Sequence, residues 1–174
     1  MSARPELTLI AIVSADGFIS TGTGVPWQLP RDKEHFRRAT RGQWLLIGRR
    51  TYEEMLGWFR DHHPLVLTRD NGFRPPIGER VGSVEEALLI AGQAGARELM
   101  VVGGSGPFAA AMPWADRLLL TEVESILGHG VPFPDIAPDQ WQVVFRQTFP
   151  PDAENALGMA MVTYERRQPR PVAA

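Results

Sequence analysis

Two glycine-containing turns in this sequence could bind phosphate groups. Gly103, Gly104, Ser105 and Gly106 follow the apolar run 99–102 and open a helical segment. Glycines in such a turn let backbone N–H groups approach an anion at a helix N-terminus, where the helix dipole favours negative charge. The pattern is neither G-x-G-x-x-G nor a P-loop with its lysine, so a plain strand-to-helix turn explains it about as well.

The second turn carries positive charge. Gly48, Arg49, Arg50 and Thr51 lie between the apolar run 44–47 and another helical segment, and Arg69 follows the run 65–68. Two arginines in the first turn of a helix are unfavourable because they oppose its dipole, and an anion bound beside them would offset that cost. Ligands of parallel sheets bind outside the carboxyl ends of the strands, so these groups could converge on one phosphorylated ligand. The alternative is that they are ordinary solvated arginines.

One carboxylate has a setting that could support catalysis. Asp32 falls in the first turn of a helix whose apolar residues, Phe36 among them, must face the core, and Trp27 precedes it. A carboxylate at this helix position commonly complements the dipole. In a partly apolar cleft it would instead have a raised pKa and could bind a cationic or amidine-like group.

Other chemistries are excluded or disfavoured by residue type and spacing. The chain has no cysteine, which removes disulfides, thiolate metal ligands and a cysteine nucleophile. The four histidines lack metal-ligand spacing, so we expect no metal site. No serine nucleophile elbow is present.

The apolar runs and the segments between them predict an α/β fold. Runs at 7–13, 44–47, 65–68, 99–102 and 118–123 lack clean alternation, which is typical of strands buried on both faces. Helical segments are predicted at 31–40, 51–55, 83–94 and 106–112, the third with a capping box that starts at Ser83. Segments 141–149 and 159–166 predict an antiparallel hairpin. We expect one domain over residues 1–167 and a flexible tail at 168–174.

The charge composition limits the kinds of partner that this protein could bind. The 174 residues hold 18 Lys and Arg against 20 Asp and Glu, a net charge of −2. This balance disfavours nucleic acid or an anionic membrane as a partner. The N-terminal apolar run is too short to cross a bilayer. We therefore expect a cytoplasmic protein that acts on a small molecule.

A series of short motifs runs along the chain from about residue 7 to 166. One is Pro26-Trp27-Gln28-Leu29-Pro30-Arg31-Asp32. The others are Leu9-Ile10-Ala11, Ile47-Gly48-Arg49-Arg50-Thr51, Leu67-Thr68-Arg69, Val102-Gly103-Gly104 with Phe108, Leu120-Thr121-Glu122, and Phe133-Pro134. In order and approximate spacing these motifs resemble dihydrofolate reductase, the Pro26–Asp32 segment most specifically. The resemblance implies a central eight-stranded sheet, mostly parallel with an antiparallel C-terminal edge strand and flanked by helices, in a monomeric protein.

The same resemblance implies the reaction and the substrate site. NADPH would transfer a hydride to the pterin ring of 7,8-dihydrofolate and give tetrahydrofolate. Asp32 would anchor the pterin and favour its protonation, with Trp27 and Thr121 completing the polar network. The remaining substrate contacts would be Ile10, Ala11, Phe36, Met55, Arg60 and Phe108.

For the cofactor, the resemblance implies a mobile loop at residues 17–25, which contributes Ile19, and a cis peptide between the paired glycines. Arg49 and Arg69 would grip the 2′-phosphate, which predicts NADPH over NADH because a dianion gains more from arginine pairing than a hydroxyl does. The full expected set of cofactor contacts is Ala11, Ile19, Gly48, Arg49, Arg50, Thr51, Thr68, Arg69, Gly103, Gly104, Ser105, Gly106 and Phe108.

Three positions depart from the family pattern. His62 stands where the family has an arginine that clamps the glutamate tail of the substrate, and Arg60 could substitute from two residues away. Phe108 replaces a common tyrosine. Gly130 replaces an acidic residue that helps to hold the closed loop, which predicts a loop that closes less readily.

Two alternatives remain at this stage. The first is a reductase of the same fold that acts on another dihydropterin or on a ribosylamino-pyrimidine, which the missing glutamate clamp favours. The second is a non-catalytic nucleotide-binding domain. Asp32 with Trp27 argues against the second, because a pure dinucleotide binder needs neither residue.

Overall fold

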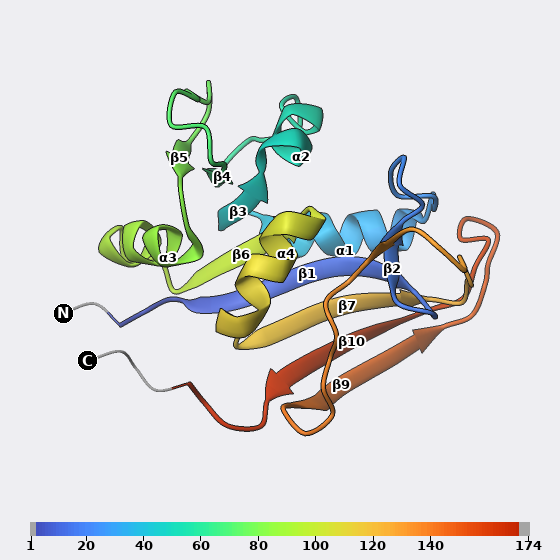
Figure 1. Ribbon diagram of the computed structural model, residues 1–174. Helices are drawn as coiled ribbons and strands as arrows, with labels where there is room; N and C mark the ends of the chain where they lie inside the picture. Colours follow the sequence, from blue (N-terminus) through green and yellow to red (C-terminus); the bar gives the residue numbers. More distant parts are fainter. Residues whose placement is uncertain (1–2, 171–174) are drawn as a thin grey trace.

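The computed structural model describes residues 3–170 and is built around one large twisted sheet (Figure 1). Its strands, with those of a small second sheet, are β1 (Glu6–Ser14), β2 (Phe18–Ser20), β3 (Trp44–Gly48), β4 (His63–Leu67), β5 (Glu79–Val81), β6 (Glu98–Gly103), β7 (Arg117–Val123), β8 (Val131–Pro132), β9 (Trp141–Phe149) and β10 (Met159–Arg166). The helices are α1 (Pro30–Thr40), α2 (Arg49–Glu54), α3 (Val84–Gln93), α4 (Ser105–Ala111) and the 3₁₀ turn η1 (Met112–Trp114). Within residues 3–170, no helix is both long and apolar enough to cross a membrane.

The large sheet has eight strands in the order β5-β4-β3-β6-β1-β7-β10-β9. Strands β5 to β7 pair in parallel, and β10 pairs antiparallel with both β7 and β9. The small sheet joins β2 to β8. The expected eight-stranded, mostly parallel sheet with an antiparallel C-terminal strand is confirmed.

The position of the edge differs from the expectation. The C-terminal strand β10 lies one strand in, and β9 forms the edge. The reason is burial: β10 supplies Met159, Ala160 and Val162 to the core, whereas β9 is exposed from Gln142 to Thr148. The more apolar strand of the hairpin therefore occupies the inner position.

Both faces of the sheet are covered, as the apolar runs predict. On one face Leu7, Leu9 and Val101 pack with residues of α3 and α4. On the other face Ile10, Leu45 and Met100 pack with residues of α1 and α2. Figure 1 shows α4 in front of the sheet and α1 behind it. This arrangement fixes the start of α1, α2 and α4 relative to the strand ends.

The element boundaries match the sequence closely in places. The hairpin strands have the predicted limits, and the four helices start or end within two residues of the predicted ones. Most of the predicted tail, 168–174, lies outside the described residues. Within its described part, the guanidinium of Arg170 lies 5.8 Å from the ring centre of Trp114.

The helix α3 allows a test of the local folding argument. The Ser83 hydroxyl accepts the Glu86 backbone N–H at 3.1 Å, and the Glu86 carboxylate accepts the Gly82 N–H. Loss of such a cap costs about 1 kcal/mol. We expect Ser83→Ala to lower the free energy of unfolding by that amount in urea titration, while Ser83→Thr keeps most of it. Equal stability of the alanine and wild-type proteins would contradict the capping role.

Candidate active site

A cavity of about 890 Å³ opens where β3, β4 and β6 end, beside the middle of β1. Its lining contains most of the residues expected from the sequence: Ile10, Ala11, Ile19, Trp27, Asp32, Phe36, Gly48, Arg49, Arg50, Thr51, Met55, Gly103, Gly104, Ser105, Gly106 and Phe108. A second cavity of about 830 Å³, between α1 and the β9–β10 hairpin, contains none of them. The structure therefore brings most of the expected substrate and cofactor residues together in one place; Thr121, Arg60, Thr68 and Arg69 are not in the lining.

The carboxylate of Asp32 lies on the first turn of α1, which begins at Pro30 with no side-chain cap. Burial raises the pKa of this carboxyl, while hydrogen bonding from the Thr121 hydroxyl and the nearby His35 act in the opposite direction. Thr121 is 1% exposed and lies on β7 opposite Ile12 of β1. The sheet thus positions a buried hydroxyl behind the carboxylate: Asp32 lines the cavity, which a cationic ring could enter, whereas Thr121 does not line it.

Apolar side chains form the walls around this carboxylate. Trp27 is 7% exposed and packs with Leu29, Val123 and Met159. Phe36 and Met55 pack against the cluster that contains Ile10. Such walls exclude water and strengthen electrostatic interactions inside the cleft.

The other end of the cavity is built from backbone. The Gly103–Gly104 peptide is cis, Gly103 has φ +124°, and Gly104 precedes α4. A Cβ at Gly104 would lie 3.2 Å from the Thr51 hydroxyl, and one at Gly48 would lie 3.2 Å from Pro107. Neither α2 nor α4 has a side-chain cap, so N–H groups of both first turns remain for a ligand. This glycine cradle with two open helix ends fits the pyrophosphate of a dinucleotide.

The loop expected to close over the cavity lies at its mouth. Residues 19, 20 and 22–25 line the cavity, and the loop is tied to the segment before β8 by Asp16, whose carboxylate accepts the N–H groups of Leu127 and Gly128. These bonds and one from Ser14 lower the pKa of Asp16 to about 2. Gly130 has φ +131°, and a Cβ there would lie 2.1 Å from the Ser20 carbonyl oxygen. Glycine is therefore required at position 130 for this close contact with the loop. That the loop closes less readily without an acidic residue at 130 remains a prediction.

Arg60, expected among the substrate contacts, lies outside the cavity. Its guanidinium donates to the carbonyl oxygens of Gly57 and Phe59 at 3.0 and 3.2 Å. The His62 side chain is 6% exposed and stacks on Trp58 at 4.2 Å, and its Nδ1 accepts the Arg60 backbone N–H. Burial lowers the pKa of His62, so the ring is neutral at neutral pH and packs as an aromatic group.

Thr68 and Arg69 also lie outside the cavity lining, beyond the end of β4. The Thr68 hydroxyl accepts the Asp70 N–H, and Arg69 is exposed. Sequence reasoning missed the acidic partners of the other arginines: Arg49 pairs with Glu53 and Asp70, and Arg50 pairs with Glu54. The spacing of four residues from Arg49 to Glu53 and from Arg50 to Glu54 was a usable signal, because such pairs meet on a helix.

Comparison with known proteins agrees with this geometry. Residues 6–166 match the family model described as dihydrofolate reductase. The chain is 32% identical over 162 residues to dihydrofolate reductase type 3 of Salmonella typhimurium, covering 93% of this chain and 99% of that protein. It is 36% identical over 124 residues to dihydrofolate reductase of Mycobacterium tuberculosis, covering 68% and 73% of the two chains.

Among solved structures, the fold matches a dihydrofolate reductase from Enterococcus faecalis complexed with NADP(H) and RAB-propyl. The TM-score is 0.84 at 26% identity, covering 97% of this chain and all of that one. The fold and cavity are thus those of a nucleotide-dependent reductase. The chain belongs to the dihydrofolate reductase family.

The burial of the Asp32 carboxylate predicts how the stability of the fold depends on pH. Because the folded-state pKa of Asp32 is raised above its ordinary value of 3.8, ionisation destabilises the fold as the pH rises through the folded-state pKa. We expect Asp32→Asn to raise the melting temperature near neutral pH, with the difference shrinking as the pH falls toward 3.8. Asp139→Asn, at an exposed position, serves as the control. A lower melting temperature for Asp32→Asn at neutral pH would contradict the burial argument.

Proposed function

We propose that this protein reduces 7,8-dihydrofolate to 5,6,7,8-tetrahydrofolate with NADPH. The observation that carries the proposal is the half-buried Asp32 carboxylate beside Thr121, at the apolar end of a cavity whose other end is a glycine cradle lined with arginines. We further propose that it acts as a cytoplasmic monomer in tetrahydrofolate biosynthesis. The near-balanced charge of −2 supports a small-molecule partner over nucleic acid.

Asp32 anchors the pterin in this proposal. A carboxylate among apolar walls binds the amino and ring N–H groups of the pterin edge, and its charge favours the protonated ring. Addition of a hydride to a C=N bond is easier when the nitrogen is protonated, so this electrostatic effect lowers the barrier. Thr121 holds the carboxylate in position, and water delivers the proton.

NADPH, when bound, supplies the hydride. The residues that would hold it are the glycine cradle Gly103–Gly106, with Ser105 at the start of α4, and Thr51 with the arginines at the start of α2. Ile19, Ala11 and Phe108 line the same cavity as the cradle and Asp32. The loop at residues 17–25 covers the mouth and excludes water from the reacting atoms.

Replacement of the carboxylate tests the proposal. We expect Asp32→Asn to lower kcat/KM for dihydrofolate by about a hundredfold or more, because the neutral amide no longer stabilises the protonated ring. The measurement is NADPH oxidation followed by absorbance. Glu34→Gln, on the same helix but paired with Arg37 and Arg38 at the surface, is the matched control. No turnover by wild type, or full activity of Asp32→Asn, would refute the assignment.

A second candidate is another dihydropterin without a glutamate tail. The observation in its favour is that His62 is packed on Trp58, and that Arg60 lies outside the cavity lining with one guanidinium nitrogen bonded to the carbonyl oxygens of Gly57 and Phe59. A bidentate arginine clamp would bind a tail carboxylate far more strongly than a neutral, packed histidine.

The two substrates can be separated directly. We expect the kcat/KM of wild type for dihydrofolate and for a tail-less dihydropterin to differ by less than about tenfold. This is the difference that one charge-assisted contact to the tail would make. Asp32→Asn serves as the common control, since it should lower both values. A strong preference for the tailed substrate would show that another residue binds the tail, and the second candidate would then fail.

A further inference from the structure

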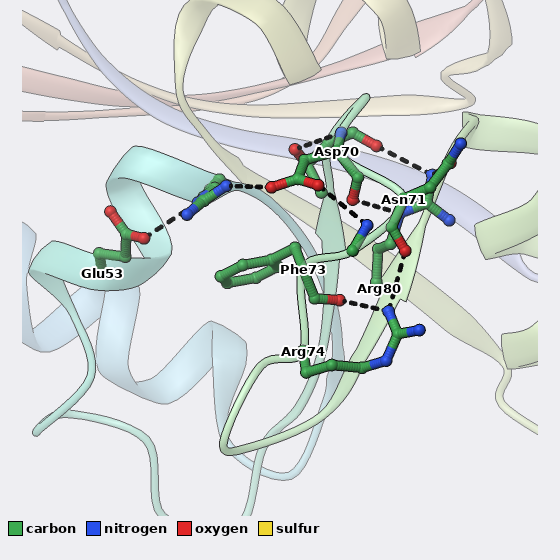
Figure 2. Close-up of polar contacts among 9 residues, drawn as sticks. Glu53, Asp70, Asn71, Phe73, Arg74 and Arg80 are labelled. Atoms are coloured by element: carbon green, nitrogen blue, oxygen red, sulfur yellow. Dashed lines mark hydrogen bonds and ion pairs between the residues drawn. The ribbon is translucent and has the colours of Figure 1, made fainter.

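The Arg49 guanidinium lies at the start of α2 and is held on three sides. Its Nε donates to Glu53 at 3.0 Å, and one terminal nitrogen donates to Asp70 at 2.9 Å. The guanidinium carbon lies 4.3 Å from the ring centre of Phe73. Figure 2 shows the Glu53 and Asp70 carboxylates on opposite sides of the guanidinium that both accept from, with the Phe73 ring beside it. The cation expected to bind a phosphate thus already has two carboxylate partners.

Asp70 is itself fixed by the turn that follows β4. One carboxylate oxygen accepts the Gly72 N–H at 2.9 Å, and the Asp70 N–H donates to the Thr68 hydroxyl. Arg80 donates to the Asp70 carbonyl oxygen and to the Asn71 side chain (Figure 2). The Gly72 N–H, and then Arg49, lower the pKa of the Asp70 carboxyl. The turn therefore holds an ionised carboxylate against Arg49 at neutral pH.

The location of this pair gives it a role toward the cofactor. Arg49 lines the cavity where β3 ends, and Asp70 follows the end of the neighbouring parallel strand β4. Asp70 is not one of the lining residues, but its 2.9 Å bond to Arg49 places its carboxylate next to the guanidinium that does line the cavity. A 2′-phosphate there would need the same guanidinium N–H groups that Asp70 accepts, and its two charges would repel the carboxylate. A ribose 2′-hydroxyl would instead donate to a carboxylate, as acidic residues do for NAD in other nucleotide folds.

We propose that Asp70 is a specificity-determining residue that weakens the preference for NADPH over NADH, by competing with the 2′-phosphate for Arg49 and by accepting a hydrogen bond from a free 2′-hydroxyl. The inference rests on the proposed function, because it concerns the cofactor of that reaction. It adds a competing carboxylate to the expectation that Arg49 and Arg69 grip the 2′-phosphate.

The test is the binding of adenosine 2′,5′-bisphosphate and adenosine 5′-monophosphate, measured by calorimetry without turnover. Asp70→Asn keeps an oxygen for the Gly72 N–H and removes the charge. We expect it to tighten binding of the bisphosphate by about tenfold, from the removal of one charge near a dianion in a water-exposed site. Binding of the monophosphate should stay equal or weaken, and the NADPH-to-NADH ratio of kcat/KM should rise in parallel.

Asp139→Asn is the matched control, because it removes the same charge from an exposed position before β9, at the opposite edge of the sheet from β4 and β5. We expect no change in either affinity. Weaker binding of the bisphosphate to Asp70→Asn would overturn the inference and show that Asp70 positions Arg49 for the phosphate. Unchanged affinities would overturn it as well. Either result leaves the proposed reaction intact if wild type still reduces dihydrofolate, whereas absence of that turnover refutes the reaction itself.

Discussion

The parallel pairing of β3, β6 and β1 is the constraint on which the site depends. Because these strands run in one direction, their carboxyl ends meet along one side of the sheet, and the turns after Gly48 and Gly103 are brought together. Each turn starts a helix, so two helix N-termini open into the same cavity. A sequence with these turns separated by more than 50 residues can build one binding site only through this pairing.

The substrate end depends on a different contact, between a helix and the sheet. Pro30 starts α1, which places Asp32 in the first turn beside Thr121 of β7. The carboxylate is partly removed from water there, which disfavours its charged form, so the arrangement costs folding stability at neutral pH. A carboxylate that lowers folding stability in this way is typical of a functional group, since an amide of the same shape would have a smaller desolvation cost.

Much of this could be predicted from the sequence, for local reasons. The strands, the capping box at Ser83 and the hairpin limits are signalled by neighbouring residues, and the glycine turns follow from their spacing. The parts that differed depend on how side chains pack in the folded protein. Whether β9 or β10 takes the edge depends on how each packs on the sheet, and the inward turn of His62 depends on Trp58 and Phe59. The Asp70 partner of Arg49 is 21 residues away in sequence and could not be assigned without the fold.

The two ends of the cavity use charge in opposite ways. Asp32 is shielded from water, so its charge acts strongly and a neutral replacement cannot imitate it. Arg49, Arg50 and their carboxylate partners are exposed, with side chains 42–86% accessible, and solvent screens each pair. Changes in the exposed set therefore alter affinity in small steps and leave the fold intact. Cofactor selectivity can therefore shift one residue at a time, while the buried Asp32 carboxylate has no such freedom.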